Sequence, residues 1–195
     1  MNFIFDVGNV LVSYKPKSFL EGLFPDEGLA SKVFEIIFKC AEWESMDLGK
    51  LTHKEATAIF CAREPEYKAA IEKTMDNLFD IFTPEFATIS LLPEIKKAGH
   101  DLYYLSNIHR EVRDYILAEY RVFDLFDGGV FSCDVFTTKP SAEIYLRLLS
   151  NYRLSPEDCL FFDDVEENVE AARKQGISGI LFTGVECVLP YYSGK

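Results

Sequence analysis

Four short stretches of the chain follow apolar runs and carry the polar side chains best suited to chemistry. In chain order they are Asp6, Ser106 with Asn107, Lys139, and Asp163 with Asp164. Together they offer a carboxylate nucleophile, hydroxyl and amide donors, one cation and a pair of hard oxygen ligands. Phosphoryl transfer needs this combination, because a nucleophile, a divalent cation and donors to the phosphoryl oxygens must converge on one site.

The carboxylates differ in what their positions allow. Asp6 is available as a nucleophile or as a metal ligand. Asp163 and Asp164 are adjacent at the end of a predicted strand and point to opposite faces, so we expect only one of them to aim fully at the site. Asn168 lies four residues after Asp164, one helical turn away, and we expect it to orient that carboxylate.

Each of these residues also has an ordinary structural explanation when it is taken alone. Asp6 or Asp164 is a suitable helix N-cap, and Ser106 and Asn107 are common turn residues. Their conjunction favours chemistry, because side chains that follow parallel strands meet at the same carboxyl edge of the sheet. There, backbone amides at a helix start favour an anion, and Lys139 adds a positive charge.

From residue 84 onward the elements that must position these side chains alternate between helix and strand. Strands are predicted near residues 102–105, 130–132, 159–162 and 179–182, and helices at 109–120, 141–150 and 166–175. Gly99 and Gly176 fall where glycines end helices. The alternation predicts an α/β fold, a doubly wound parallel sheet with helices on both faces.

The segment of residues 14–83 has a different character, with apolar residues at helical spacing. Thr52 and Glu55 fit a capping box at the start of one of its helices. Strand-to-helix connections usually span about 2 to 6 residues, so an insertion of this length should fold by itself. We predict a core of residues 1–13 and 84–195 and a helical cap subdomain of residues 14–83.

Composition limits the classes of partner. The chain has 195 residues and a formal net charge of -12, which disfavours nucleic acid and anionic membranes. No stretch approaches the roughly 18 apolar residues of a transmembrane helix, and no signal peptide is visible at the N-terminus. A cytoplasmic location is therefore expected, while the oligomeric state is not indicated and a monomer is compatible with the sequence. Five cysteines without close pairing argue against a disulfide framework or a zinc site.

The ordered motifs resemble those of a known family. The four segments are Asp6-Val7-Gly8-Asn9-Val10, Leu105-Ser106-Asn107, Lys139-Pro140, and Asp163-Asp164 with Asn168. They resemble the motifs of the haloacid dehalogenase (HAD) superfamily, with its Rossmann-like core, and the insertion resembles its C1 helical cap. Within that family the first motif is similar to that of sugar-phosphate phosphatases of the α-D-glucose-1-phosphate phosphatase type. It is more distantly similar to that of the phosphatase domain of soluble epoxide hydrolase.

This resemblance implies a magnesium-dependent phosphatase acting on a small phosphomonoester, with a sugar phosphate as the expected substrate. Asp6 would form an aspartyl phosphate, Ser106 and Asn107 would hold the phosphoryl group, and Lys139 would neutralise charge. The implied Mg²⁺ ligands are Asp6, the backbone carbonyl of Gly8 and Asp164, with Asp163 and Asn168 in support. The family's sheet order places the first strand between the second and the fourth.

The sequence departs from most phosphatases of the superfamily at Gly8, where they carry a second Asp that protonates the leaving group. General acid catalysis is typically worth a factor of about 10² to 10⁴. Three interpretations stay open. We favour a phosphatase whose leaving group needs less protonation or that recruits another group or water. The others are a 2-haloacid dehalogenase, in which Asp163 and Asp164 would lack a role, and a non-catalytic protein that binds a phosphorylated ligand.

Residues that set specificity are expected in the cap, which would close over the site and exclude water. Trp43, Glu44 and Asp47 occupy a segment that could face the pocket, although Trp43 is explained as well by packing. His109 follows Asn107 by two residues and could reach the pocket mouth. We expect it instead, with Arg110, in an exposed first helical turn.

Overall fold

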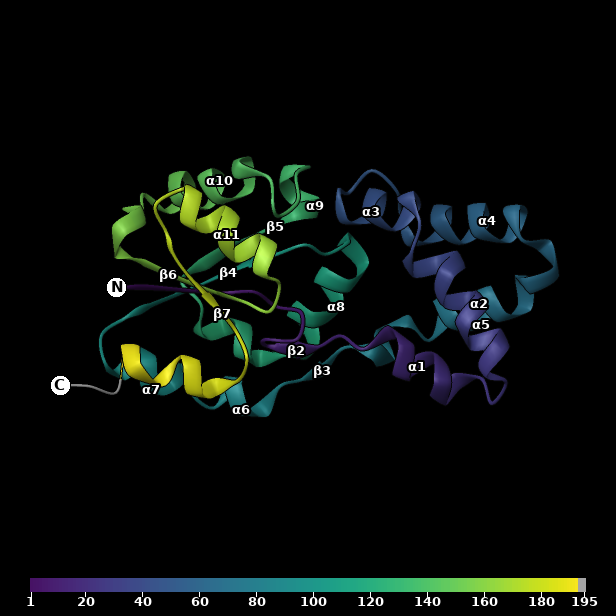
Figure 1. Ribbon diagram of the computed structural model, residues 1–195, viewed down its shortest axis with the longest axis horizontal. Coiled ribbons are helices and arrows are strands. Elements are labelled where there is room, and N and C mark those ends of the chain that lie inside the picture. Colours follow the sequence, from purple (N-terminus) through teal and green to yellow (C-terminus); the bar gives the residue numbers. More distant parts are fainter. Residues whose placement is uncertain (193–195) are drawn as a thin grey trace.

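The computed structural model describes residues 1–192 and places a layered α/β body beside a helical one (Figure 1). Its main sheet has five parallel strands in the order β5-β4-β1-β6-β7. The strands are β1 (Asn2–Phe5), β4 (Asp101–Ser106), β5 (Gly128–Phe131), β6 (Cys159–Asp163) and β7 (Ser178–Leu181). The first strand lies between the second and fourth strands of this sheet, which confirms the expected order.

Helices cover both faces of the sheet, as predicted for a doubly wound fold. Phe3 and Phe5 pack in one apolar cluster with α7 (Leu92–Lys97) and α8 (Arg110–Glu119). Ile4 lies in the other cluster with α10 (Ala142–Tyr152) and α11 (Glu166–Lys174). Because β1 buries alternate side chains on opposite faces, it reads as one continuous apolar run.

Short elements complete the core. They are α6 (Phe86–Ile89), α9 (Ser132–Val135), and the 3-10 turns η3 (Arg121–Leu125), η4 (Pro156–Asp158), η5 (Val185–Cys187) and η6 (Leu189–Tyr191). The prediction of a strand at residues 130–132 was wrong at its end, because Ser132 begins α9. Gly99 and Gly176 both have φ of 83° just after helices, which confirms their helix-ending role.

In sequence, the helical body is flanked by two short strands, β2 (Val12–Ser13) and β3 (Thr83–Pro84), which pair with each other as an antiparallel ribbon. Its elements are α1 (Pro16–Leu23), α2 (Glu27–Phe38), α3 (Ala41–Asp47), α4 (His53–Arg63), η1 (Pro65–Tyr67), α5 (Lys68–Asp76) and η2 (Leu78–Ile81). Figure 1 shows the chain crossing to this body and back through β2 and β3. The reciprocal capping box of Thr52 and Glu55 starts α4, as predicted. The division into core and cap subdomains stays a prediction.

The helical body contacts the core closely at the end of α3. Gly49 has φ of +65°, and a Cβ at this position would lie 2.4 Å from the backbone oxygen of Cys133. Ser132 Oγ donates a hydrogen bond to the backbone oxygen of Asp47 at 2.6 Å. This close approach needs glycine at position 49. The close contact and the hydrogen bond together hold the last turn of α3 against the carboxyl edge of the sheet.

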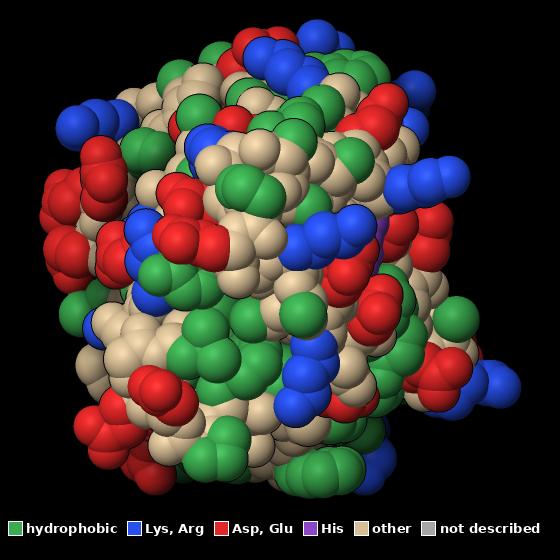
Figure 2. Space-filling model, turned by 90° about the vertical axis from the view of Figure 1, so that its right-hand side faces the viewer, with side chains coloured by type: hydrophobic (Ala, Val, Ile, Leu, Met, Phe, Trp, Pro, Cys, Tyr) green, Lys and Arg blue, Asp and Glu red, His purple; other side chains and the backbone are tan. Residues whose placement is uncertain are grey.

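The surface of the helical body carries both signs of charge. Figure 2 views the molecule from this side, where Lys and Arg side chains lie among Asp and Glu side chains instead of gathering together. This face therefore has no basic stripe of the kind that tracks a nucleic acid backbone. A membrane-spanning helix needs roughly 18 or more apolar residues, and none of the helices within residues 1–192 meets this requirement.

Candidate functional site

The predicted residues converge at the carboxyl edge of three neighbouring strands. Asp6 directly follows β1, Ser106 ends β4, and Asp163 ends β6. Since β4, β1 and β6 are adjacent in the sheet, their ends share one edge. Lys139 reaches this edge from the connection between α9 and α10. The sheet order therefore brings Asp6 and Asp163 together, although they lie 157 residues apart in sequence.

Lys139 forms a buried ionic bridge at the centre of the site. Its Nζ lies 2.7 Å from Asp6 Oδ1 and 2.6 Å from Asp163 Oδ2, and its side chain is 2% exposed. Burial raises the pKa of Asp6 to about 7, although the Lys139 charge opposes the rise. Burial also opposes the charged form of Lys139, yet Asp6 and Asp163 together raise the pKa of its ammonium. The bridge thus keeps a cation beside the candidate nucleophile.

Asp163 is held rigidly and acts on the site through Lys139. Its carboxylate accepts hydrogen bonds from Lys139, from the backbone N–H of Val165 at 2.8 Å and from Asn168 Nδ2 at 3.0 and 3.1 Å. The expectation that Asn168 orients Asp164 was therefore wrong. Asp163 is the carboxylate that points inward, and Asn168 meets it from the first turn of α11.

Asp164 has a different partner, which sequence reasoning missed. Asn9 Nδ2 donates to Asp164 Oδ2 at 3.0 Å, and Asn9 Oδ1 accepts from the backbone N–H of Tyr14 at 2.9 Å. Asn9 has φ of 56°, a left-handed conformation that Asn adopts more readily than most residues. An Asn next to Gly8 in the turn after β1 was the available signal for this role.

The carboxylates could hold a divalent cation. Asp6, Asp163 and Asp164 each offer one oxygen, and these oxygens lie within 4.8 Å of one another. Hard oxygen ligands of this kind suit Mg²⁺. Because the Asp163 oxygens already accept hydrogen bonds, Asp6 and Asp164 are the better candidates for direct ligands. The expected contribution of the Gly8 carbonyl stays a prediction.

The second motif serves the site in two ways. Ser106 is 2% exposed and lines the cavity above the sheet edge. The Asn107 side chain donates to the backbone oxygen of Lys139 at 3.0 Å and accepts from its backbone N–H at 2.8 Å. Asn107 therefore positions Lys139 through both halves of its amide. Contact of Ser106 or Asn107 with a phosphoryl group stays a prediction.

A cavity of about 190 Å³ opens beside this cluster, between the sheet edge and the helical body. It is lined by Val7, Gly8, Val12, Tyr14, Trp43, Asp47, Phe82, Ser106, Asn107, Ile108 and His109. Trp43 forms part of this wall and also packs on Phe38, with ring centroids 4.6 Å apart. The cavity is therefore largely apolar, and its polar side chains include Ser106, Asn107 and His109 from the core and Asp47 from α3.

His109 differs from the sequence expectation. It is 1% exposed, so the prediction of an exposed first helical turn was wrong for this residue. The Trp43 ring packs on it edge to face with centroids 5.2 Å apart, and the His53 ring lies 6.4 Å away. Both neighbours come from the helical body, and their docking buries His109.

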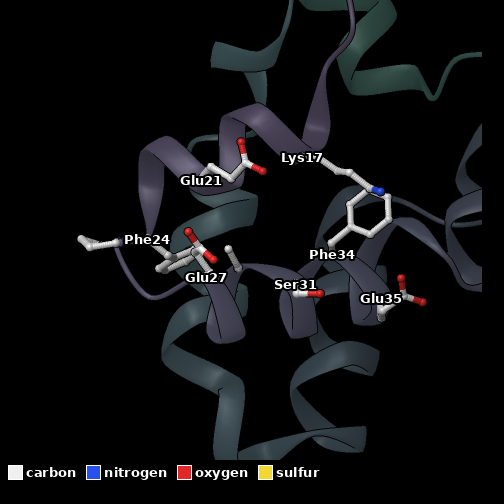
Figure 3. A pocket seen from close by; sticks show the side chains of 9 residues that line it. Lys17, Glu21, Phe24, Glu27, Ser31, Phe34 and Glu35 are labelled. Carbon is white, nitrogen blue, oxygen red and sulfur yellow. The ribbon is translucent and has the colours of Figure 1, made fainter.

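A larger cavity of about 530 Å³ lies on the outside of the helical body, between α1 and α2 (Figure 3). Glu21, Glu27 and Glu35 line it with a single cation, Lys17, whose Nζ lies 5.2 Å from the centroid of the Phe34 ring. Its excess of carboxylates would repel a phosphate. The smaller cavity instead lies next to the ionic bridge, because it is lined by Val7, which follows Asp6, and by Asn107, which hydrogen-bonds the backbone of Lys139. The smaller cavity is therefore the candidate active site.

Comparisons with known proteins agree with this site. The family model for haloacid dehalogenase-like hydrolases matches residues 1–176. A sesquiterpene phosphatase of Aspergillus oryzae is 27% identical over 180 residues, covering 92% of this chain and 88% of that protein. A phosphorylated carbohydrates phosphatase of Thermotoga maritima is 42% identical over 55 residues, 28% of this chain and 26% of that protein.

The fold is also similar to that of solved structures. A HAD family enzyme of Bacteroides thetaiotaomicron, determined in complex with magnesium and inorganic phosphate, superposes with a TM-score of 0.70. The two chains are 19% identical, and the match covers 94% of each. At this level of identity the similarity establishes the fold.

Proposed function

The chain belongs to the haloacid dehalogenase-like hydrolases, and from this membership we propose that it is a magnesium-dependent phosphatase acting through an aspartyl phosphate on Asp6. The observation that carries the proposal is the buried bridge of Lys139 between Asp6 and Asp163. Burying one ammonium between two carboxylates carries a desolvation penalty that can exceed the Coulombic gain, so stability alone does not explain the bridge. A cation next to a carboxylate nucleophile is what an incoming phosphoryl dianion needs.

In the proposed first step Asp6 attacks phosphorus, and the bond to the leaving oxygen breaks on the opposite side. Lys139 stabilises negative charge shared between Asp6 and the phosphoryl oxygens, while Ser106 donates a hydrogen bond to one of them. Asp6, Asp164 and the Gly8 carbonyl would hold Mg²⁺, whose charge favours ionised Asp6 and offsets that of the phosphoryl group. Water then hydrolyses the aspartyl phosphate and regenerates Asp6.

The organic part of the substrate would occupy the cavity under residues 14–83, which we propose as the cap. A sugar phosphate is the first candidate, supported by the carbohydrate phosphatase relative and by Asp47 and His109 as partners for hydroxyl groups. A terpenyl phosphate is the second candidate. It is supported by the apolar wall that includes Tyr14, Trp43 and Phe82 and by the sesquiterpene phosphatase relative.

Two other functions are less well supported. A 2-haloacid dehalogenase would have no use for Asp164, which lies beside Asp6 with an oxygen free for a cation. A non-catalytic phospho-ligand-binding protein would have no chemical need for Asp6 to contact Lys139.

The test is hydrolysis of 4-nitrophenyl phosphate by the purified protein with Mg²⁺, followed by a panel of sugar and terpenyl phosphates. We expect EDTA and Asp6→Asn each to abolish activity, while Asp80→Asn, an equivalent change outside the site, leaves it intact. A folded protein that is inactive across the panel would leave the binding function. Release of halide from 2-chloropropionate without metal would support the dehalogenase.

A further inference from the structure

A phosphatase with glycine at position 8 lacks the side chain that usually protonates the leaving group. The fold does not impose this glycine, because a Cβ on Gly8 would meet only Tyr14 Cβ, at 3.9 Å, and its φ is not in the left-handed region. The backbone therefore accepts a Cβ at this position. The inference that follows rests on the proposed phosphatase function and concerns the group that supplies this proton.

His109 is a buried polar side chain whose acidic neighbour on α8, Glu111, lies 3.8 Å from its Nδ1, beyond hydrogen-bond distance. It occupies the N-cap position of α8 but makes no side-chain capping hydrogen bond. Within residues 1–192, neither of its ring nitrogens has a hydrogen-bond partner. Leaving such groups buried and unpaired costs stability. Because His109 lines the same cavity as Gly8 and Ser106, a bound substrate could supply the missing partner.

Titratable groups from three elements surround His109. Glu111 Oε2, on α8, lies 3.8 Å from His109 Nδ1, and His109 helps to hold the pKa of Glu111 at about 2. Asp47, on α3, lines the same cavity. The His53 ring at the start of α4 lies on another side, with ring centroids 6.4 Å apart. The pKa of His53 is lowered, first by burial and then by the His109 charge.

We propose that His109 is the general acid and base that replaces the aspartate absent at position 8. In-line attack by Asp6 directs the leaving oxygen away from that carboxylate and toward the cavity. As the P–O bond breaks, the oxygen takes a proton from the imidazolium and leaves as an alcohol. The neutral imidazole then removes a proton from the water that attacks the aspartyl phosphate. Phosphate departs, and both Asp6 and the imidazolium are restored.

The contacts of His109 also allow a purely structural role, in which the ring only supports Trp43. The two roles differ in their dependence on the leaving group. A general acid matters most for a poor leaving group such as an alkoxide and little for 4-nitrophenolate, which departs without protonation. A residue that only shapes the cavity would lower kcat/KM for both substrates alike, since its role does not depend on the leaving group.

The experiment compares kcat/KM for benzyl phosphate and 4-nitrophenyl phosphate in wild type, His109→Gln and the control His100→Gln. His100 packs on Phe3 at the opposite end of the sheet, with ring centroids 5.1 Å apart. We expect His109→Gln to lose about 10² or more on benzyl phosphate and less than about tenfold on 4-nitrophenyl phosphate. His100→Gln should leave kcat/KM unchanged for both substrates.

A second variant guards against a folding defect. Gly8→Asp in the His109→Gln background supplies a carboxyl group in the same cavity and should restore benzyl phosphate hydrolysis by at least about tenfold. Equal losses on both substrates, or full benzyl phosphate activity in His109→Gln, would overturn the role of His109 while leaving the phosphatase in place. Wild type that hydrolyses neither substrate would remove the proposed function and this inference together.

Discussion

Replacing Lys139 with methionine removes the cation of the buried bridge while keeping most of the side-chain volume. Two carboxylates then stay buried without their partner, one of them, Asp163, with no exposed side-chain surface. By Coulomb's law, one contact at about 2.7 Å is worth about 6 kcal/mol at an effective dielectric constant near 20. Desolvation of the ammonium offsets part of this energy, and breaking buried pairs typically costs about 3–5 kcal/mol. We expect Lys139→Met to lower the free energy of unfolding by about 3–5 kcal/mol at pH 8.

The loss should depend on pH with a defined sign. The folded pKa of Asp6 is raised from 3.8 to about 7, so its contribution to stability falls as pH rises and is fully lost above pH 7. In Lys139→Met the pKa of Asp6 rises further, because the lowering influence of Lys139 is gone. The variant keeps losing stability above pH 7, where the wild type no longer does. The gap should therefore widen by about 1.4 kcal/mol per pH unit above pH 7.

The assay is urea denaturation of both proteins between pH 6 and 8.5 in EDTA, so that no cation replaces the ammonium. Lys96→Met is the matched control, since Lys96 pairs with Asp127 at the surface at 2.7 Å. It should cost at most about 1 kcal/mol and show no widening. A gap for Lys139→Met that is constant across this range, or that grows on acidification, would refute the argument.

Three further substitutions, one of them with Gly99→Ala as its control, test the contacts around the site. Gly49→Ala should destabilise by about 2–4 kcal/mol by urea denaturation, because positive φ and a backbone oxygen 2.4 Å from the new Cβ both oppose it. Gly99→Ala, with positive φ and open space, should cost only about 1–2 kcal/mol, and equal costs would contradict the close contact at Gly49. Asn107→Ala should destabilise by about 1–3 kcal/mol and lower kcat, since it leaves both backbone groups of Lys139 unpaired; an unchanged kcat would argue against its positioning role. Burial raises the pKa of Asp47 to about 6, so ionisation of Asp47 costs stability as pH rises through 6. In thermal melts, the free energy of unfolding of Asp47→Asn should exceed that of wild type by about 1–3 kcal/mol at pH 8 and should equal it at pH 4. Equal stability at pH 8 would argue against the raised pKa.

The fold and the location of the site follow from the sequence because both depend on short-range patterns. Apolar runs that end in polar residues mark the strand ends, and a parallel sheet gathers its carboxyl ends at one edge. This rule suffices to bring Asp6 and Asp163 to one edge without knowledge of any contact, whereas Lys139 follows α9 instead of a strand and reaches the edge from the connection to α10. The helical spacing of residues 14–83 likewise predicts helices, which the structure contains.

The partners of individual side chains did not follow, because they depend on direction and docking. Asn168 was assigned to Asp164 by helical spacing, but the strand directs Asp163 inward to meet it. Asn9 contacts Asp164 from the turn after β1, where Asn9 takes a positive φ that the sequence pattern did not indicate. His109 was expected at the surface, since nothing near it in sequence indicates that Trp43 packs over it.

The most direct test of the account is identification of the residue that carries the phosphoryl group during turnover. The protein is mixed with Mg²⁺ and 4-nitrophenyl phosphate, quenched in acid within the first turnovers, digested, and analysed by mass spectrometry. The account predicts one phosphoryl group on the N-terminal peptide at Asp6, and none in Asp6→Asn treated in the same way. Turnover with the phosphoryl group on another residue, or activity retained by Asp6→Asn, would contradict it.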